Sequence, residues 1–169
     1  MAKIEYLETD EQGLDSIGHL WQKLIEYHKE RSPQHFSGHY TMITFDLRKK
    51  QLLEKSGKGS MRIDLARDTE TGKLVGYCVS TILGDKQGEI ESIYIEESYR
   101  HSGIGDNFMK KALHWMDGLS VKKKIVGVGA GNEEVFSFYS RYSFYPRATI
   151  LEQVVTGKKA DSSLRLGGP

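Results

Sequence analysis

Arginine and glycine residues at a fixed spacing form the part of this sequence best suited to bind an anion. Arg100, Gly103 and Gly105 stand in the order Arg-x-x-Gly-x-Gly, directly before a stretch with helical periodicity. Glycines let the backbone come close to a ligand, and the first helical turn leaves amide N–H groups unpaired at its positive dipole end. The spacing therefore predicts an anion-binding turn, most naturally for phosphate.

A strand and a helix would position this turn. Residues 89–95 are rich in β-branched and aromatic side chains, which predicts a strand. From Ile104 onward, apolar residues recur three to four positions apart at Phe108, Ala112 and Trp115, which predicts a helix with one buried face. We therefore expect a strand, a tight turn and an amphipathic helix in succession.

Composition indicates an ordinary globular protein. The chain has 169 residues, of which 38% are hydrophobic and 28% charged, with a net charge of +1. This balance excludes a strongly basic nucleic-acid-binding tail, and no apolar run approaches membrane-spanning length. The single cysteine, Cys78, excludes a disulfide framework. We expect a cytoplasmic protein, monomeric or homodimeric, with no nucleic-acid or membrane partner and no metal.

The remaining periodicities predict a mixed α/β fold of α+β type. We expect strands at 3–8, 61–67, 73–83, 89–95, 124–129 and 149–155, and helices at 13–32, 45–55, 104–116 and 132–142. Residues 33–40 are predicted as an irregular loop, because Pro33 ends the first helix. This order implies a central mixed, mostly antiparallel sheet with helices on both faces.

The Arg100–Gly105 pattern, preceded by a strand and Tyr99, resembles the pyrophosphate-binding signature of the GNAT family of acyl-CoA-dependent N-acyltransferases. Residues 138–144, Phe-Tyr-Ser-Arg-Tyr-Ser-Phe, resemble the Phe-Tyr-x-x-x-Gly-Phe ending of that family. The resemblance implies a single GNAT domain over residues 1–156, and the polar, glycine-containing composition of residues 157–169 predicts a mobile tail. The resemblance also implies acetyl-CoA as cosubstrate.

The resemblance assigns a set of coenzyme-binding residues. They are Ile93, Tyr94, Ile95, Arg100, His101, Ser102, Gly103, Ile104, Gly105, Asn132, Phe138 and Tyr139. In this family the pantetheine arm inserts where the strand at 89–95 splays from the next one. The glycines of residues 127–131 would permit that approach, and they lack the G-x-G-x-x-G spacing of a nicotinamide site.

The implied reaction is acetyl transfer to a primary amine by direct attack in a ternary complex. It needs an unprotonated amine, a polarised carbonyl and a protonated leaving thiolate. Glu89 and Glu91 are the candidate bases, and the resemblance favours Glu91 acting through water. Two solvated strand carboxylates are the alternative. The alternation of side chains along the strand cannot show whether Glu89 or Glu91 faces the site, because family members usually carry a bulge here. The backbone N–H groups near Ile93 to Ile95 would polarise the carbonyl.

Tyr139 is the candidate general acid, because its place in the family ending puts its hydroxyl at the coenzyme sulfur. Tyr142, one helical turn on, is the alternative, and core packing explains either ring. Ser143 stands where the family commonly has glycine, so we expect the helix end to close differently. His101 stands where glycine is frequent, which would place an imidazole near the phosphates. Asn132 is predicted as an N-cap that also contacts the pantetheine arm.

The acceptor would be met by the first two helices and their loop. The candidate residues are Trp21, Tyr27, His28, Phe36 and Tyr40. A small-molecule amine is favoured over a protein N-terminus or lysine, and a catalytically silent acyl-CoA-binding module is the rival hypothesis. Cys78 is predicted as a core thiol. His35 and His39 are not expected to bind metal, because Pro33 and Gly38 argue against a shared helix.

Overall fold

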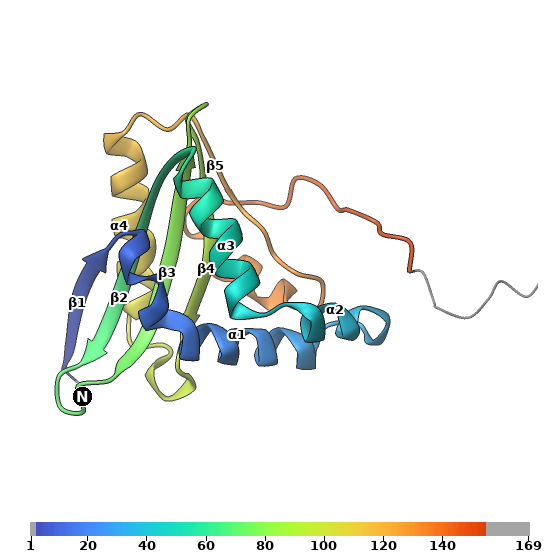
Figure 1. Cartoon of the computed structure of the whole chain (residues 1–169), viewed down its shortest axis with the longest axis horizontal. Coiled ribbons are helices and arrows are strands. Elements are labelled where there is room, and N and C mark those ends of the chain that lie inside the picture. Colours follow the sequence, from blue (N-terminus) through green and yellow to red (C-terminus); the bar gives the residue numbers. More distant parts are fainter. Residues whose placement is uncertain (1–2, 155–169) are drawn as a thin grey trace, which may run out of the picture.

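The central element is a five-stranded sheet with the strands in sequence order. A computed structural model describes residues 3–154. The strands are β1 (Ile4–Thr9), β2 (Gly59–Asp68), β3 (Leu74–Leu83), β4 (Gln87–Ile95) and β5 (Lys123–Val126) (Figure 1). The first four pair antiparallel with their neighbours, and β5 pairs parallel with β4. The predicted mixed, mostly antiparallel sheet is confirmed.

Helices cover both faces of the sheet, as predicted. The elements before β2 are η1 (Glu11–Ile17), α1 (Gly18–Arg31), η2 (Gln34–Phe36), α2 (Ser37–Met42) and α3 (Phe45–Ser56). Those after β4 are η3 (Glu97–Tyr99), α4 (Ile104–Gly118), η4 (Glu133–Val135) and α5 (Phe136–Ser140). Figure 1 shows α3 and α4 on opposite sides of the sheet.

Two hydrophobic cores follow from the alternation of side chains along the strands. Tyr77 and Val79 of β3 pack with η1, α1 and α3, whereas Cys78 between them packs with α4. The predicted face of α4 is buried, with Ile104, Phe108, Met109, Ala112 and Met116 at 0 to 1% exposure. This packing fixes the start of α4, and therefore the glycine turn, against the end of β4.

The bulge that the resemblance led us to expect lies at Glu91. Val79 of β3 pairs with Ser92 and Ser80 pairs with Ile90, so Glu91 is the extra residue on β4. The bulge changes which face the following residues of β4 present. It is the reason that sequence alternation alone could not orient Glu89 and Glu91.

Several predicted boundaries are wrong. The first helix begins as the 3₁₀ segment η1, and residues 33–40, predicted as a loop, contain η2 and most of α2. The helix predicted over 132–142 is reduced to η4 and α5. Residues 37–42 form a helical turn although Gly38 lies among them, because α1 packs against α2, an effect that local composition does not reveal.

The helix end at Ser143 closes as a glycine would close it. Ser143 adopts a left-handed φ of 64°, and the Phe144 amide donates to the Tyr139 carbonyl at 3.2 Å. The expectation of a different closure is wrong, because packing of the following Phe144 against Tyr139 accompanies the strained turn.

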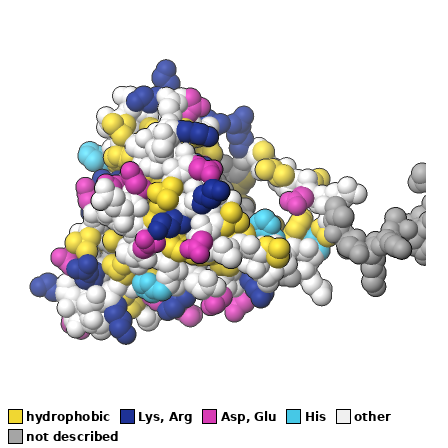
Figure 2. Space-filling model, viewed as in Figure 1, with side chains coloured by type: hydrophobic (Ala, Val, Ile, Leu, Met, Phe, Trp, Pro, Cys, Tyr) yellow, Lys and Arg dark blue, Asp and Glu magenta, His cyan; other side chains and the backbone are white. Residues whose placement is uncertain are grey.

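The predicted last strand is also corrected. Residues 149–154 form no strand and are exposed. Residues 145–154 run away from the sheet and extend beyond the body of the molecule (Figures 1 and 2; Figure 2 has the same view). Residue 155 and the tail predicted over 157–169 lie outside the described residues, so the division at 156 stays a prediction. None of the helices in the described residues is both long and apolar enough to cross a membrane.

Candidate active site

A single cavity of about 1320 Å³ joins most of the residues singled out from the sequence. One wall comes from α1, α2 and α3, and the other from β4, the start of α4 and residues 126–141. Residues more than a hundred positions apart in sequence, such as Trp21 and Tyr139, therefore line one space. Its size suits a small ligand and part of a coenzyme together.

The predicted anion-binding turn lies at the rim of this cavity. His101 and Gly103 adopt left-handed φ values of 60° and 88°, and Gly103 is the N-cap of α4 without a side-chain cap. The hydrogen bonding of α4 begins at Asn107, whose amide donates to the Gly103 carbonyl at 3.0 Å. The amides of residues 104–106 are thus available to an anion.

Arg100 is held beside the turn by the backbone and by aromatic rings. Its Nε donates to the Ile95 carbonyl at 3.0 Å, and its guanidinium carbon lies 5.1 Å from the Tyr27 ring centroid and 5.8 Å from that of Tyr94. A cation fixed in this way adds positive charge to the anion site. Arg100, His101, Gly103 and Gly105 line the cavity, whereas Ser102 and the buried Ile104 do not.

The two strands above the turn separate where the resemblance led us to expect it. Parallel pairing of β4 with β5 stops at Ile90 and Val126. Beyond that point Ile93, Tyr94 and Ile95 of β4 face the cavity opposite residues 127–129. The β4 edge in this gap has backbone groups that β5 does not bond. An extended chain with amide groups could hydrogen-bond there, as in β-strand addition.

Asn132 carries an unsatisfied polar atom at the same gap. The residue is 8% exposed, it lines the cavity, and its Oδ1 has no hydrogen-bond partner among the described residues. Asn132 occupies the N-cap position of η4, as predicted, but its side chain makes no cap hydrogen bond. A buried acceptor without a partner is costly, so a ligand N–H donor would stabilise it.

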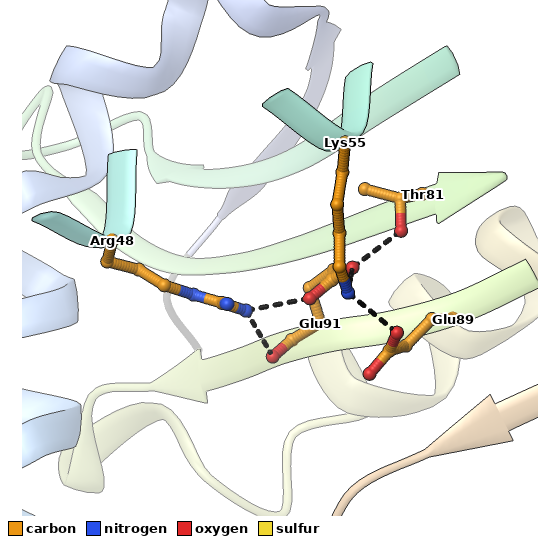
Figure 3. A network of polar contacts seen from close by, with 5 residues as sticks. All are labelled: Arg48, Lys55, Thr81, Glu89 and Glu91. Atoms are coloured by element: carbon orange, nitrogen blue, oxygen red, sulfur yellow. Dashed lines mark hydrogen bonds and ion pairs between the residues drawn. The ribbon is translucent and has the colours of Figure 1, made fainter. Parts of the chain in front are cut away.

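Glu91 is enclosed by a network of donors (Figure 3). Its side chain is 2% exposed, and it accepts from Arg48 Nη2 at 2.8 Å, Lys55 Nζ at 2.5 Å and Thr81 Oγ1 at 2.6 Å. Burial alone would raise the pKa of Glu91, but the hydrogen bonds from Lys55 and Thr81 and the charge of Arg48 outweigh it and lower the pKa. The group is therefore a carboxylate that takes up a proton reluctantly.

Glu89 shares only one of these partners. Its Oε2 accepts from Lys55 Nζ at 2.8 Å, and it does not line the cavity, whereas Glu91 does. Burial would lower the pKa of Lys55, but its hydrogen bonds to Glu89 and Glu91 raise it. Lys55 thus stays a cation that links the two candidate bases.

Tyr139 projects into the cavity from α5 with its ring packed between aromatic neighbours. The ring centroids of Phe138 and Phe144 lie 5.2 Å and 6.3 Å away. Among the described residues its hydroxyl makes no hydrogen bond. Burial, with Cys78 nearby, raises the pKa of Tyr139, so the hydroxyl keeps its proton. Tyr142, the alternative, is bonded through its hydroxyl to Asp106.

Four of the five candidate acceptor residues line the cavity and one does not. Trp21, Tyr27, His28 and Tyr40 line the cavity, whereas Phe36 lies outside it and packs on His35 at a centroid distance of 4.5 Å. Burial and Arg31 lower the pKa of His28, which keeps its imidazole neutral near pH 7. Arg48, Gln51 and Met42 also line the cavity. Sequence reasoning missed all three residues. The helix of Arg48 and Gln51 was predicted, but α3 has no motif that indicates which face meets the cavity, and Met42 ends α2, which was not predicted as a helix.

The described residues contain no group of three or more His, Cys, Asp or Glu side chains that could hold a metal ion. Cys78 is buried and forms no disulfide. Among the described residues, the groups of the cavity best placed for chemistry are thus the backbone amides of the turn, the cation of Arg100, the enclosed carboxylate of Glu91 and the protonated phenol of Tyr139. That set suits anion binding and proton donation.

Comparison with protein families identifies the chain. The sequence model described as the acetyltransferase (GNAT) family matches residues 21–144. The chain belongs to the GNAT acetyltransferase family and is an acyltransferase. No curated protein matches the sequence.

Solved structures share the fold at low sequence identity. A GCN5-related N-acetyltransferase from Ralstonia eutropha has a TM-score of 0.70 and 16% identity, covering 90% of this chain and 99% of its own. The PaiA N-acetyltransferase from Thermoplasma acidophilum, in complex with coenzyme A, has a TM-score of 0.67 and 15% identity, with coverages of 88% and 93%. An aminoglycoside acetyltransferase from an uncultured soil metagenomic sample, in complex with sisomicin, has a TM-score of 0.60 and 13% identity. The match covers 92% of this chain and 97% of that protein. These likenesses confirm the GNAT fold.

Proposed function

We propose that the protein transfers an acetyl group from acetyl-CoA to a primary amine by direct attack in a ternary complex. The observation that carries this proposal is the joining, in one cavity, of an anion-binding turn, a gap between β4 and β5, and a buried phenol. The turn would take the pyrophosphate, the gap the pantetheine arm, and Tyr139 would lie at the thioester. A location in the cytoplasm belongs to the same proposal, supported by the buried, unbridged Cys78.

The residues present fit coenzyme A. The free amides of residues 104–106 and the charge of Arg100 suit phosphate, and the orphaned Asn132 Oδ1 suits an amide N–H of the pantetheine. A structural neighbour, PaiA from Thermoplasma acidophilum, was solved with coenzyme A. The coenzyme supplies the activated thioester. Ile93, Tyr94, Ile95, His101, Gly103, Gly105 and Phe138 complete the proposed binding surface, with Ser102 and Ile104 shaping the turn from outside the cavity.

The transfer forms one N–C bond and breaks one C–S bond. The ammonium loses a proton before attack, and the departing thiolate gains one. Glu91, which lines the cavity, is favoured over Glu89 as the group that accepts the proton through a water molecule. Its low pKa makes it a weak base, so its main contribution is to orient that water and to stabilise positive charge on the attacking nitrogen. Tyr139 donates the proton to the sulfur.

A small-molecule amine is favoured over a protein N-terminus or lysine side chain. On the acceptor wall, Trp21 and His28 of α1 and Tyr40 of α2 line one space. A concave space of this kind suits a compact ligand better than an extended peptide.

The test is incubation of the full chain with acetyl-CoA and a panel of amines, with release of free thiol as the readout. We expect thiol release that depends on the amine, and an acetylated amine of matching amount by mass spectrometry. Tight binding of acetyl-CoA by calorimetry without thiol release for any amine or peptide would favour a catalytically silent acyl-CoA-binding module instead.

A further inference from the structure

The acceptor wall of the cavity is largely apolar. Its apolar and aromatic side chains include Trp21, Leu24, Ile25, Tyr40, Ile43 and Leu47. The polar side chains that α1, α2 and α3 add to this wall are Tyr27, His28, His39, Arg48 and Gln51. Within residues 3–154, these helices therefore contribute no carboxylate to the cavity lining. Met42 on the rim is 78% exposed.

Each carboxylate elsewhere in the lining is already paired. Glu91 is bonded to Arg48 and Lys55 at 2.8 and 2.5 Å. Asp106 lies 3.1 Å from Arg141, and Glu134 lies 3.4 Å from Arg31 and accepts from the Tyr27 hydroxyl at 2.6 Å. A second ammonium on the acceptor would meet the Arg48 guanidinium and no free counter-charge, which is costly in a partly dry site.

We infer that the acceptor is a primary amine on an apolar or aromatic body, with a single positive charge, and that polycations such as polyamines and aminoglycosides are rejected. This inference rests on the proposed function. The apolar wall would bind the body of the amine, while the one ammonium would be neutralised by losing its proton through a water molecule that Glu91 orients. Arg48 acts as a specificity-determining residue by pairing with Glu91, which leaves this carboxylate unable to bind a further ammonium.

The test compares phenethylamine and hexylamine with spermidine and sisomicin at fixed acetyl-CoA. We expect kcat/KM for the best apolar monoamine to exceed that for spermidine by about a hundredfold, since an unpaired buried charge costs several kcal/mol of binding. A preference for spermidine or sisomicin overturns the inference and leaves the proposed acetyltransferase in place. Failure of the proposed function is distinguishable, because no amine would then release thiol.

A designed carboxylate gives a second readout. Met42→Glu places a free carboxylate on the rim of the acceptor wall, and Met42→Gln is the matched neutral control. We expect Met42→Glu to shift the ratio of kcat/KM values about fivefold toward spermidine, because an exposed ion pair contributes up to about 1 kcal/mol. The ratio should be unchanged in Met42→Gln. Equal ratios in both variants overturn the inference.

Discussion

Arg48 binds Glu91 twice through the same nitrogen. Nη2 lies 2.8 Å from Glu91 Oε2 and 3.3 Å from the Glu91 carbonyl oxygen. Glu91 is the bulge residue of β4, and a bulge interrupts the ladder hydrogen bonds. Arg48 therefore fixes both the backbone and the side chain of the same irregular residue. Lys55, two helical turns along α3 and on the same face, holds the other carboxylate oxygen.

Glu91→Gln should lower turnover more than Glu89→Gln. Glu91 lines the cavity and has three side-chain donors, whereas Glu89 has only Lys55 and lies outside the cavity. Removing the charge of Glu91 also leaves Arg48 and Lys55 poorly compensated, so we expect Glu91→Gln to destabilise the fold by about 3 kcal/mol. Steady-state kinetics and urea unfolding measure the two effects.

Glu89→Gln is the matched control, because it removes one carboxylate from the same strand and the same lysine. If it proves the more damaging change for turnover, the wrong carboxylate has been assigned. Equal turnover in both variants and the natural protein would make the network structural only.

The lowered pKa of Glu91 predicts how stability depends on pH. A carboxyl group with a depressed folded-state pKa stabilises the fold above its ordinary pKa near ~4.3, and that contribution is lost as the pH falls through the lowered value. The difference in unfolding free energy between the natural protein and Glu91→Gln should therefore be constant from pH 6 to 8. It should shrink as the solution is acidified below pH ~4. A difference that changes between pH 6 and 8 would contradict the assigned pKa direction.

Activity should rise with pH for a different reason. Glu91 is ionised throughout the neutral range, so its titration produces no inflection there. The acceptor ammonium titrates near ~10, as lysine does, and only its neutral form attacks. We expect kcat/KM to rise close to tenfold per pH unit from pH 6 to 8 with an unhindered amine. A plateau beginning below pH 7 would indicate another proton acceptor, and His28, whose lowered pKa leaves it neutral, would be substituted next.

Substitution of the turn glycines should weaken coenzyme A binding. Gly103 has a φ of 88°, which a β-branched side chain strains, and a Cβ on Gly105 would lie 3.1 Å from Phe138 Cε2. Gly103→Val and Gly105→Val should displace the amides that face the phosphate, each worth up to about 1.5–3 kcal/mol, or roughly a tenfold to hundredfold loss of affinity. Isothermal calorimetry with coenzyme A measures it.

Gly118→Val is the control for these substitutions. It lies at the other end of α4 with no atom near an added Cβ, so coenzyme affinity should be retained. Unchanged affinity in folded Gly103→Val and Gly105→Val would remove the turn from the binding site.

The turn could be predicted from sequence, and the network around Glu91 could not. Arg100, Gly103 and Gly105 are neighbours in the chain, so their spacing alone indicates a strand, a turn and a helix start. Arg48 and Lys55 lie 43 and 36 residues from Glu91, and only the packing of α3 on the sheet brings them together. Residues 149–154 have strand propensity, but a strand needs a partner edge that propensity does not provide.

Tyr139→Phe tests the proposed general acid. The substitution removes only the hydroxyl, so the ring contacts with Phe138 and Phe144 survive and the fold should hold. The hydroxyl makes no hydrogen bond within the described residues, so its loss leaves no partner unsatisfied there. Burial raises the pKa of Tyr139, and the phenol is therefore protonated and ready to donate at every pH at which the enzyme works.

The size of the effect follows from the leaving group. A thiol titrates near ~8.5 and a phenol near ~10, so the thiolate departs moderately well without help. Positioned general acids contribute roughly 10²–10⁴-fold, and the low end applies here. We expect kcat to fall about 10²-fold with little change in acetyl-CoA affinity, and Tyr142→Phe to keep kcat, because its hydroxyl binds Asp106. A loss confined to affinity would make Tyr139 a binding residue. Unaltered kinetics with a productive acceptor would show that Tyr139 serves only in core packing.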